Sequence, residues 1–404
     1  MIELIAPAGD WPSLKAALDN GANGVYFGVT QLNMRDNARS FEVNELTKVA
    51  ETVHARGARA YLTLNAIVFD EEIPMMERIV TAARDAGIDA IICWDISVIS
   101  CARELGMRVH LSTQASVSNV RAVAHYARLG VSRIVLAREC TLKQIRTIKE
   151  YIDKEGLAVS LEAFIHGALC ISISGRCFMS EYLFGQSANR GKCLQPCRRR
   201  YHIIDTDNES ELVVADGYVM SPKDICTLPF LETVLGAGVT ACKIEGRMRP
   251  PEYVAAVTRV YRQAIDAVAQ GVLNAEKKEA GMQELTTVYN RGFSSGFYFG
   301  MPANDLAAAG GSVARERKRY IGEVRKYYAR IGVAEVMVRN DGLSLGQRIL
   351  ISGKRTGVFE QPVTEMQMDH VPITMSGRGD RVAIKVTAPV ARGDKVFVVE
   401  TAAS

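Results

Sequence analysis

The 404 residues are enough for two or three domains, and 48% hydrophobic with 23% charged residues is typical of a soluble globular protein with a sizeable core. No run approaches the roughly 18 consecutive apolar residues of a membrane helix, which excludes an ordinary membrane-spanning protein. The net charge of +4 is too small to indicate a nucleic-acid partner, so only local groups of basic residues can argue for one.

Short apolar strands alternate with amphipathic helices from residue 3 onward. The chain enters its first strand without the basic start and apolar core of a signal peptide, so we predict a cytoplasmic location. Alternation of this length predicts a parallel sheet covered by helices. The predicted strands are Glu3–Ala6, Gly24–Gly28, Arg59–Leu64, Ala90–Trp94, Arg108–Ser112, Arg133–Ala137 and Val159–Phe164, and the helical patterns include Trp11–Asn20, Val43–Arg56, Ile73–Ala86, Asn119–Leu129 and Leu142–Lys154.

Residues 166–200 interrupt this alternation with four cysteines and several glycines. Cys170, Cys177, Cys193 and Cys197 follow the spacing C-x6-C-x15-C-x3-C. Glycines let the backbone turn tightly around a small inorganic group, and four thiolates can supply all the ligands of a [4Fe–4S] cluster. Structural zinc is an alternative, although its ligands usually come in closer pairs, and inert or redox-active thiols are another. The remaining five cysteines are most simply small buried hydrophobes, with Cys226 and Cys242 as backup ligands.

The alternation resumes after the cysteines and predicts a (β/α)₈ barrel. Tyr201–Asp205 and Glu211–Ala215 read as an inserted hairpin. The strand Tyr218–Ser221, the helix Leu228–Leu235 and the strand Ala241–Ile244 follow. Nine candidate strands compete for eight places, so we expect Tyr218–Ser221 or a segment beside it to lie outside the ring. A doubly wound sheet is less favoured because no glycine-rich phosphate loop follows the first strand.

Polar residues follow the predicted barrel strands, where the active sites of such barrels are built. They are Asn65, Asp95, Ser112, Gln114, Arg138, Glu139, Glu162, His166, Glu245 and Arg247. The Arg138–Glu139 and Glu245–Arg247 pairs could instead be structural ion pairs, and His166 could be a hydrogen-bonded core residue. Arg35 and Arg39, in the loop after the second strand, could bind a carboxylate or a phosphate, or could simply be solvated.

The composition changes after residue 302. Residues 303–319 read as a linker that ends in the basic run Arg315–Arg319, and residues 320–404 read as a small all-β barrel. Its predicted strands include Gly332–Val338, Arg348–Ser352, Val382–Val386 and Lys395–Val399. Such a domain could hold RNA, but a purely stabilising role is equally consistent with the sequence.

Four segments resemble peptidase family U32: Glu162–Cys170, Ser174–Ser180, Ser187–Arg198 and Lys243–Arg249. The resemblance covers essentially the whole chain. It implies an oxygen-independent hydroxylase that holds a [4Fe–4S] cluster on Cys170, Cys177, Cys193 and Cys197, since the better understood members modify tRNA, ribosomal RNA or a quinone precursor in this way. The resemblance to the tRNA branch implies 5-hydroxyuridine formation at the wobble position, with prephenate as a co-substrate.

Three alternatives remain beside tRNA hydroxylation. Hydroxylation of a cytidine in 23S rRNA is the alternative within the same chemistry, whereas the quinone-type relatives lack a C-terminal β domain. A U32-type peptidase or collagenase is the alternative of another class. Gly292–Gly296 reads GFSSG and formally matches a nucleophile elbow, but it does not join a strand to a helix, and no H-E-x-x-H motif is present. A scaffold protein that only holds a cluster is the third.

The RNA hydroxylase hypothesis assigns a role to each candidate residue. A base must leave its stack before an enzyme can act on its edge, and Lys and Arg side chains can bind the phosphates around it. We expect catalytic roles for Glu162, His166, Arg138, Glu139 and Glu245, and substrate or RNA contacts for Arg35, Arg39, Asn65, Gln114, Arg198, Arg199, Arg247 and Arg249.

Overall fold

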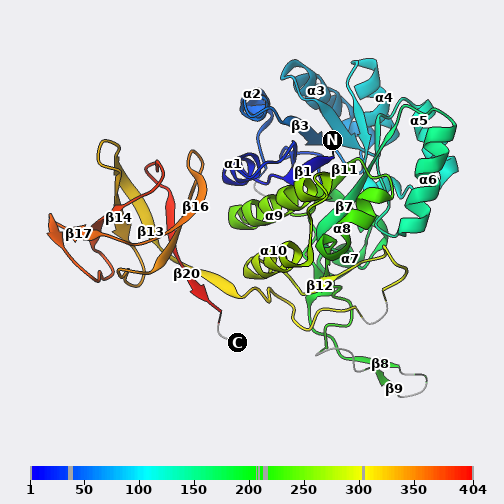
Figure 1. The fold of residues 1–404 in the computed structure, drawn as a ribbon. Helices are drawn as coiled ribbons and strands as arrows, with labels where there is room; N and C mark the ends of the chain where they lie inside the picture. The colour runs from blue at the N-terminus through cyan, green and yellow to red at the C-terminus, as the bar shows by residue number, and fades with distance from the viewer. Residues whose placement is uncertain are drawn as a thin grey trace.

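The computed structural model describes residues 2–34, 40–205, 207, 210–212, 217–302 and 305–402. Figure 1 shows two domains, a helix-covered barrel and a smaller β domain at the C-terminal end. No helix of these residues is both long enough and apolar enough to cross a membrane.

Eight parallel strands form a closed ring, which confirms the predicted barrel. Strands β1 to β7 pair in chain order, and β11 pairs with both β7 and β1 and so closes the ring. The strands are short runs of buried, mostly apolar residues, as a sheet covered on its outer face and filled within requires. Their bounds are β1 Glu3–Pro7, β2 Gly24–Gly28, β3 Arg59–Thr63, β4 Ala90–Cys93, β5 Val109–Leu111, β6 Arg133–Val135, β7 Ser160–Ala168 and β11 Ala241–Ile244.

Helices surround the ring and bury their apolar faces against it. The side chain of Asp10 caps α1 by accepting a hydrogen bond from the backbone N–H of Ser13, and Thr141 with Gln144 forms a capping box at the start of α6. The helices are α1 Trp11–Asp19, α2 Leu46–His54, α3 Ile73–Asp85, α4 Ile96–Glu104, α5 Val120–Arg128, α6 Leu142–Lys154, α8 Leu231–Gly236, α9 Pro251–Ala269 and α10 Ala275–Thr287.

The cysteine segment leaves the barrel at the carboxyl end of β7. It contains the short helix α7 (Met179–Phe184) and leads into the hairpin β8–β9 (Ile203–Asp205 and Ser210–Leu212). A hairpin was predicted here, although residues 213–215 of its predicted second strand lie outside the described residues. The chain returns through β10 (Asp224–Cys226), which runs antiparallel to the end of β7 and pairs with β12 (Phe293–Ser294). Tyr218–Ser221 forms a turn, so the ninth candidate strand does lie outside the ring.

The C-terminal domain is one antiparallel sheet wrapped around its own apolar core, with the strand order β16-β15-β20-β13-β14-β19-β17-β18. The sheet begins at Glu316, so most of the basic run Arg315–Arg319 belongs to this domain instead of to the linker predicted over residues 303–319. The strands are β13 Glu316–Tyr328, β14 Val333–Val338, β15 Arg348–Gly353, β16 Gly357–Pro362, β17 Met366–Met368, β18 Val371–Pro372, β19 Arg381–Lys385 and β20 Lys395–Thr401.

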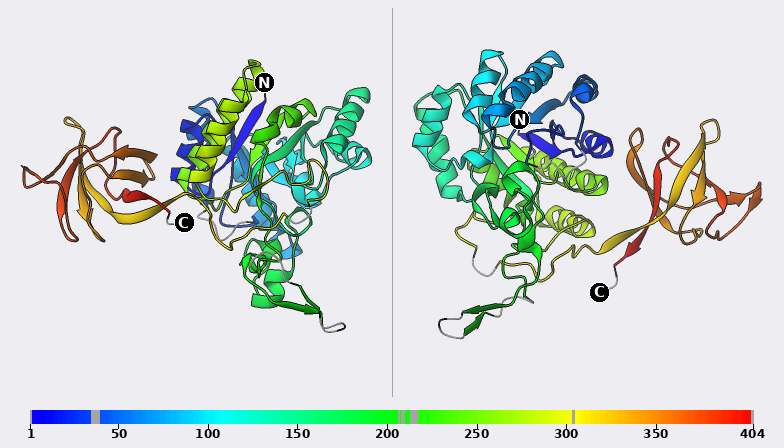
Figure 2. Two further views of the ribbon diagram at one scale, coloured as in Figure 1. Left: turned by 60° about the horizontal axis from the view of Figure 1, so that its bottom comes forward. Right: turned by 180° about the vertical axis from the view of Figure 1, so that it is seen from behind.

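The two domains touch through α1 and α9 of the barrel and β16 of the β domain (Figure 2). Val358 packs against the core of the barrel. The ammonium group of Lys15 donates to the carbonyl oxygen of Arg355 at 2.8 Å, and Lys318 pairs with Glu252 at 2.6 Å. The strand β13 is therefore tied to the barrel helix α9 as well as to its own sheet.

Candidate active site

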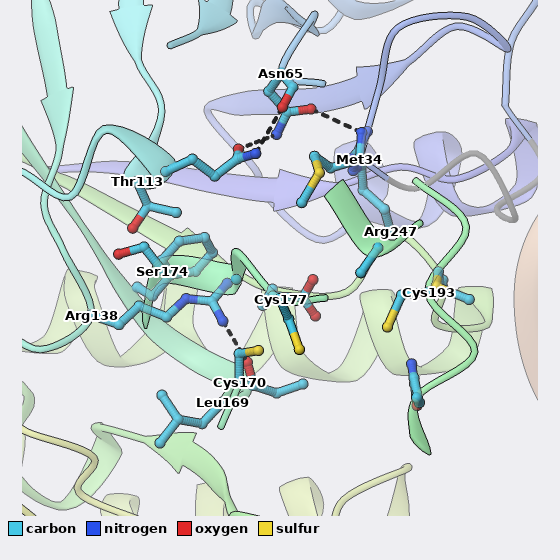
Figure 3. Close-up of a pocket in the computed structure, with 18 of the residues that line it drawn as sticks. Met34, Asn65, Thr113, Arg138, Leu169, Cys170, Ser174, Cys177, Cys193 and Arg247 are labelled. Carbon is cyan, nitrogen blue, oxygen red and sulfur yellow. Dashed lines mark hydrogen bonds between the residues drawn. The ribbon is translucent and has the colours of Figure 1, made fainter. Parts of the chain in front are cut away.

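A cavity of about 150 Å³ opens at the carboxyl ends of the barrel strands (Figure 3). Most of its walls come from three parts of the chain: the strand ends, the cysteine segment that begins after β7, and the loop that follows β11. Its polar and aromatic lining includes Tyr26, Thr63, Asn65, Ser112, Gln114, Arg138, Phe164, Lys243, Glu245, Arg247 and Arg291. The cavity thus lies at the end of the barrel where the sequence predicts an active site.

All four cysteines of the segment line this cavity and are half-buried. Two of the sulfur atoms accept backbone hydrogen bonds, Cys170 from the N–H of Ser172 and Cys177 from the N–H of Met179, each at 3.4 Å. Burial raises the pKa of Cys197; Arg198 opposes that rise, and the three other thiols add to it. Across the described residues, no three His, Cys, Asp or Glu side chains are grouped as ligands of a single metal ion.

Polar side chains fix the shape of the cysteine segment. The carboxylate of Glu139 accepts hydrogen bonds from the backbone N–H and the hydroxyl of Ser174, at 2.9 and 3.2 Å, where the backbone turns through a positive φ of 45°. The side-chain oxygen of Asn189 accepts from the N–H of Cys177 at 3.1 Å. Arg190 binds the carboxylate of Glu72 in the loop before α3. These contacts fix the backbone around the cysteines, and none of them involves a sulfur atom.

Besides Arg198, four cations line the cavity. Lys243 lies at its floor, 2.7 Å from the carboxylate of Glu162 and 4.2 Å from the centre of the Tyr26 ring. Burial lowers the pKa of Lys243, although Glu162 opposes this change. The remaining three are Arg247, which donates to the hydroxyl of Thr63 at 2.7 Å, Arg138, which stacks on Phe164 at 4.2 Å, and Arg291.

Arg291 is almost fully buried and reaches the cavity from the loop before β12. It contacts the carboxylate of Asp224 and the side-chain oxygen of Gln195, both at 3.4 Å. Burial raises the pKa of Asp224, and Arg291 opposes that rise. Arg291 therefore connects β10, the cysteine segment and the cavity.

Two predicted substrate-binding residues, Asn65 and Gln114, form a reciprocal amide pair on the cavity wall. Asn65 donates to the side-chain oxygen of Gln114, and Gln114 donates back to the carbonyl oxygen of Asn65, both at 2.7 Å. The hydroxyl of Ser112 also donates to Gln114 at 2.7 Å. The side-chain NH₂ groups of Asn65 and Gln114 each have a second N–H, which could donate a hydrogen bond to a substrate.

Four of the residues predicted at the barrel mouth lie outside the cavity lining, namely Asp95, Glu139, Glu162 and His166. Glu162 is fully buried inside the barrel, where it pairs with Lys243 and, at 3.5 Å, with Arg133. His166 faces α9, 3.3 Å from the hydroxyl of Tyr261. Burial, with a smaller contribution from Arg249, lowers the pKa of His166 to about 3, so its ring is neutral. Both positions fit structural roles better than the predicted catalytic ones.

The reason for the position of His166 is a β-bulge. The pairing of β7 with β11 shifts register after Lys243 and Phe164, so that Ile244 lies opposite His166 and Ile165 is skipped. A shift by one residue moves a side chain to the other face of a sheet. His166 therefore points outward with Ile244, although strict alternation from Glu162 would have placed it in the mouth.

The other predicted residues divide between the cavity and its surroundings. Glu245 lines the cavity, and Asp95 instead caps α4. Arg198 also lines it, but donates to the carbonyl oxygens of Leu169 at 2.5 Å and Pro222 at 2.7 Å.

The arginines further from the cavity have aromatic partners. Arg199 is exposed and stacks on Phe184, and Arg249 stacks on Tyr289 at 3.6 Å. Arg35 and Arg39 lie outside the described residues.

The backup cysteines lie away from the cavity. Cys226 is buried beside Tyr261 and Met282, and Cys242 is fully buried in the core. The cavity residues that the sequence reading missed are chiefly Lys243 and Arg291. A lysine within the apolar strand Ala241–Ile244 is the one signal that could have indicated the first.

The sequence of this chain is similar to those of several known proteins. The family model described as Peptidase family U32 matches residues 9–308. A protein of Porphyromonas gingivalis named Collagenase is 40% identical over 402 residues, which are 98% of this chain and 97% of that protein. The tRNA hydroxylation protein P1 of Bacillus subtilis is 34% identical over 331 residues, covering 80% and 77% of the two chains. A 23S rRNA 5-hydroxycytidine synthase of Escherichia coli is 32% identical over 379 residues, 89% of this chain and 55% of that protein.

Proposed function

The chain belongs to peptidase family U32, and within that family we propose that it is an RNA hydroxylase dependent on a [4Fe–4S] cluster. The observation that carries this proposal is that four thiols and five cations line one cavity at the barrel mouth. Relatives named for tRNA hydroxylation and for rRNA hydroxycytidine synthesis support the RNA substrate. More specifically, we propose that the product is 5-hydroxyuridine at the tRNA wobble position and that prephenate is the co-substrate.

The residues present suit a four-thiolate cluster. Cys170, Cys177, Cys193 and Cys197 line the same cavity, and the backbone N–H groups that approach two of the sulfur atoms are of the kind that tune iron–sulfur clusters. When bound, the cluster would supply a redox or Lewis-acid centre next to the substrate.

The protein side chains would bind and orient the substrates. Lys243 and Arg247 offer charged donors to a small anionic metabolite such as prephenate, and their contacts with Glu162 and Thr63 fix where those donors lie. The second N–H groups of Asn65 and Gln114 can donate to the edge of an unstacked base.

Nucleoside mass spectrometry of total tRNA and rRNA tests this proposal. A deletion strain should lose one hydroxylated nucleoside, and wild-type protein should restore it. Cys170→Ala should fail to complement, whereas Cys101→Ala, on α4 and outside the cavity lining, should complement fully. Identical nucleosides in the deletion and parent strains would contradict the proposal.

The relative named Collagenase makes peptidase activity the second candidate. The formal elbow serine, Ser294, lies in β12, accepts from the N–H of Gly296 at 2.9 Å and donates to Asp305. Among the described residues, no histidine lines the cavity. We therefore expect no gelatin turnover by pure protein. Turnover that a single substitution abolishes while the fold survives would favour the peptidase.

A further inference from the structure

A second hollow, of about 660 Å³, lies between the barrel and the β domain. The barrel contributes the start of α1 and the loop after β11 to it. The β domain contributes β13, the end of β15 and the start of β20. We call this hollow the interdomain groove.

The interdomain groove is strongly cationic. Five basic residues line it, namely Arg247, Arg249, Lys318, Lys354 and Lys395, against the single carboxylate of Asp10, which caps α1. Lys395 is exposed, and none of the described carboxylates lies within 4 Å of its ammonium group. The side chain of Lys354 is 62% exposed, and Glu45 lies 3.3 Å away. Such a surface favours a polyanion.

Aromatic rings from both domains lie among these cations. The ammonium group of Lys354 lies 5.5 Å from the centre of the Trp11 ring, and that of Lys318 lies 4.7 Å from the Phe397 ring. Both rings are half-buried and line the groove, Trp11 from the barrel and Phe397 from the β domain. A basic groove with aromatic faces is the arrangement by which proteins hold single-stranded nucleic acid, because cations bind the phosphates and rings stack on the bases.

The interdomain groove adjoins the cysteine-lined cavity. Arg247 and Met248 line both hollows, and Met248 is 45% exposed. A strand lying in the groove would therefore pass beside the cavity.

We propose that the interdomain groove is the docking surface for a single-stranded stretch of RNA, and that it directs a neighbouring nucleotide into the cavity. The inference rests on the proposed function for the identity of the nucleic acid. Lys354 and Lys395 bind phosphates from the β-domain side, and Trp11 with Phe397 offers faces on which bases stack. The β domain is then part of the substrate site.

Binding to the full chain is tested with a fluorescein-labelled, mixed-sequence single-stranded RNA of roughly 12 nucleotides. Fluorescence anisotropy measures the affinity at several salt concentrations. Each phosphate contact on a single strand contributes a slope of about −0.7 in log K against log salt. The double variant Lys354→Gln/Lys395→Gln should therefore show a slope shallower by about 1.4 and bind about tenfold more weakly near physiological salt.

The matched control is Arg378→Gln, an exposed cation of the β domain that lies outside the groove lining. It should retain wild-type affinity and slope. Unchanged binding in the double variant, or an equal loss in the control, would overturn the inference, as would tighter binding of a duplex of the same sequence. Because anisotropy needs no turnover, failure of the hydroxylation assay and failure of this test are separate results.

Discussion

Replacing Glu162 by glutamine should leave the charged Lys243 side chain without a carboxylate partner inside the barrel. Glu162 is fully buried and accepts from Lys243 at 2.7 Å and from Arg133 at 3.5 Å. Arg133 keeps a second carboxylate, Glu3, at 2.6 Å, so Lys243 alone loses its partner. An uncompensated buried charge typically costs about 3–5 kcal/mol, and we expect Glu162→Gln to lower the free energy of unfolding by about that amount.

Urea unfolding followed by tryptophan fluorescence measures this loss. Both tryptophans, Trp11 and Trp94, belong to the barrel and therefore report on it. With an m-value of roughly 2.5 kcal/mol per molar urea, the unfolding midpoint should fall by about 1–2 M. The double variant Glu162→Gln/Lys243→Met removes the stranded cation as well and should recover most of the loss.

The pH dependence gives an independent check. Burial lowers the pKa of Lys243 in the folded chain below the 10.5 of an ordinary lysine. The unfolded state therefore binds more protons between these two values, and stability rises with pH across that interval. Removing Glu162 lowers the folded pKa further and starts the rise at a lower pH. A loss below about 1 kcal/mol, or a double variant as unstable as Glu162→Gln, would refute the reasoning.

Three further predictions concern the cysteine segment, His166 and the end of β7. Protein purified without oxygen should carry about four iron and four sulfide ions per chain. The Cys177→Ala variant should lose them, and the Cys101→Ala variant should keep them. Colourless wild-type protein with one zinc ion per chain would exclude the cluster. Because the pKa of His166 is about 3 when folded and 6.5 when unfolded, stability should fall as pH drops from 6.5 toward 3. His166→Gln should flatten that part of the profile of urea midpoint against pH, and an unchanged profile would show that another group causes it. Gly167→Ala should cost about 2 kcal/mol or more in urea unfolding, since φ is +107° and the new methyl group would meet the carbonyl oxygen of Glu245 at 2.5 Å; wild-type stability would mean that the backbone relaxes there.

The barrel was predictable because its strands are short apolar runs between clear turn signals. The predicted bounds of Gly24–Gly28 and Ala241–Ile244 agree with β2 and β11 residue for residue. The strand β13 escaped prediction because its first residues are basic and exposed, and this resembles a linker. Hydrophobic pattern identifies a strand only where one face of it is buried.

The site was predictable in outline but not in the direction of every side chain. Position after a strand was sufficient to place Asn65, Gln114 and Arg138 in the cavity. It misplaced His166, because a bulge is a feature of strand pairing that one strand's sequence does not reveal. Arg291 is brought to the cavity by the pairing of β12 with β10. Because β12 follows the last barrel strand by some distance in the sequence, the barrel pattern gave no reason to place Arg291 there.

The location of all four thiols within residues 170–197 has a consequence for the order of events during synthesis. The ring closes only when β11, at residues 241–244, pairs with β1 and β7, so this segment leaves the ribosome before the barrel can be completed. A metallocluster delivered to the nascent chain would meet an open segment instead of a finished pocket. Insertion of the proposed cluster would therefore be able to begin while translation is still under way, and the barrel would then close around it.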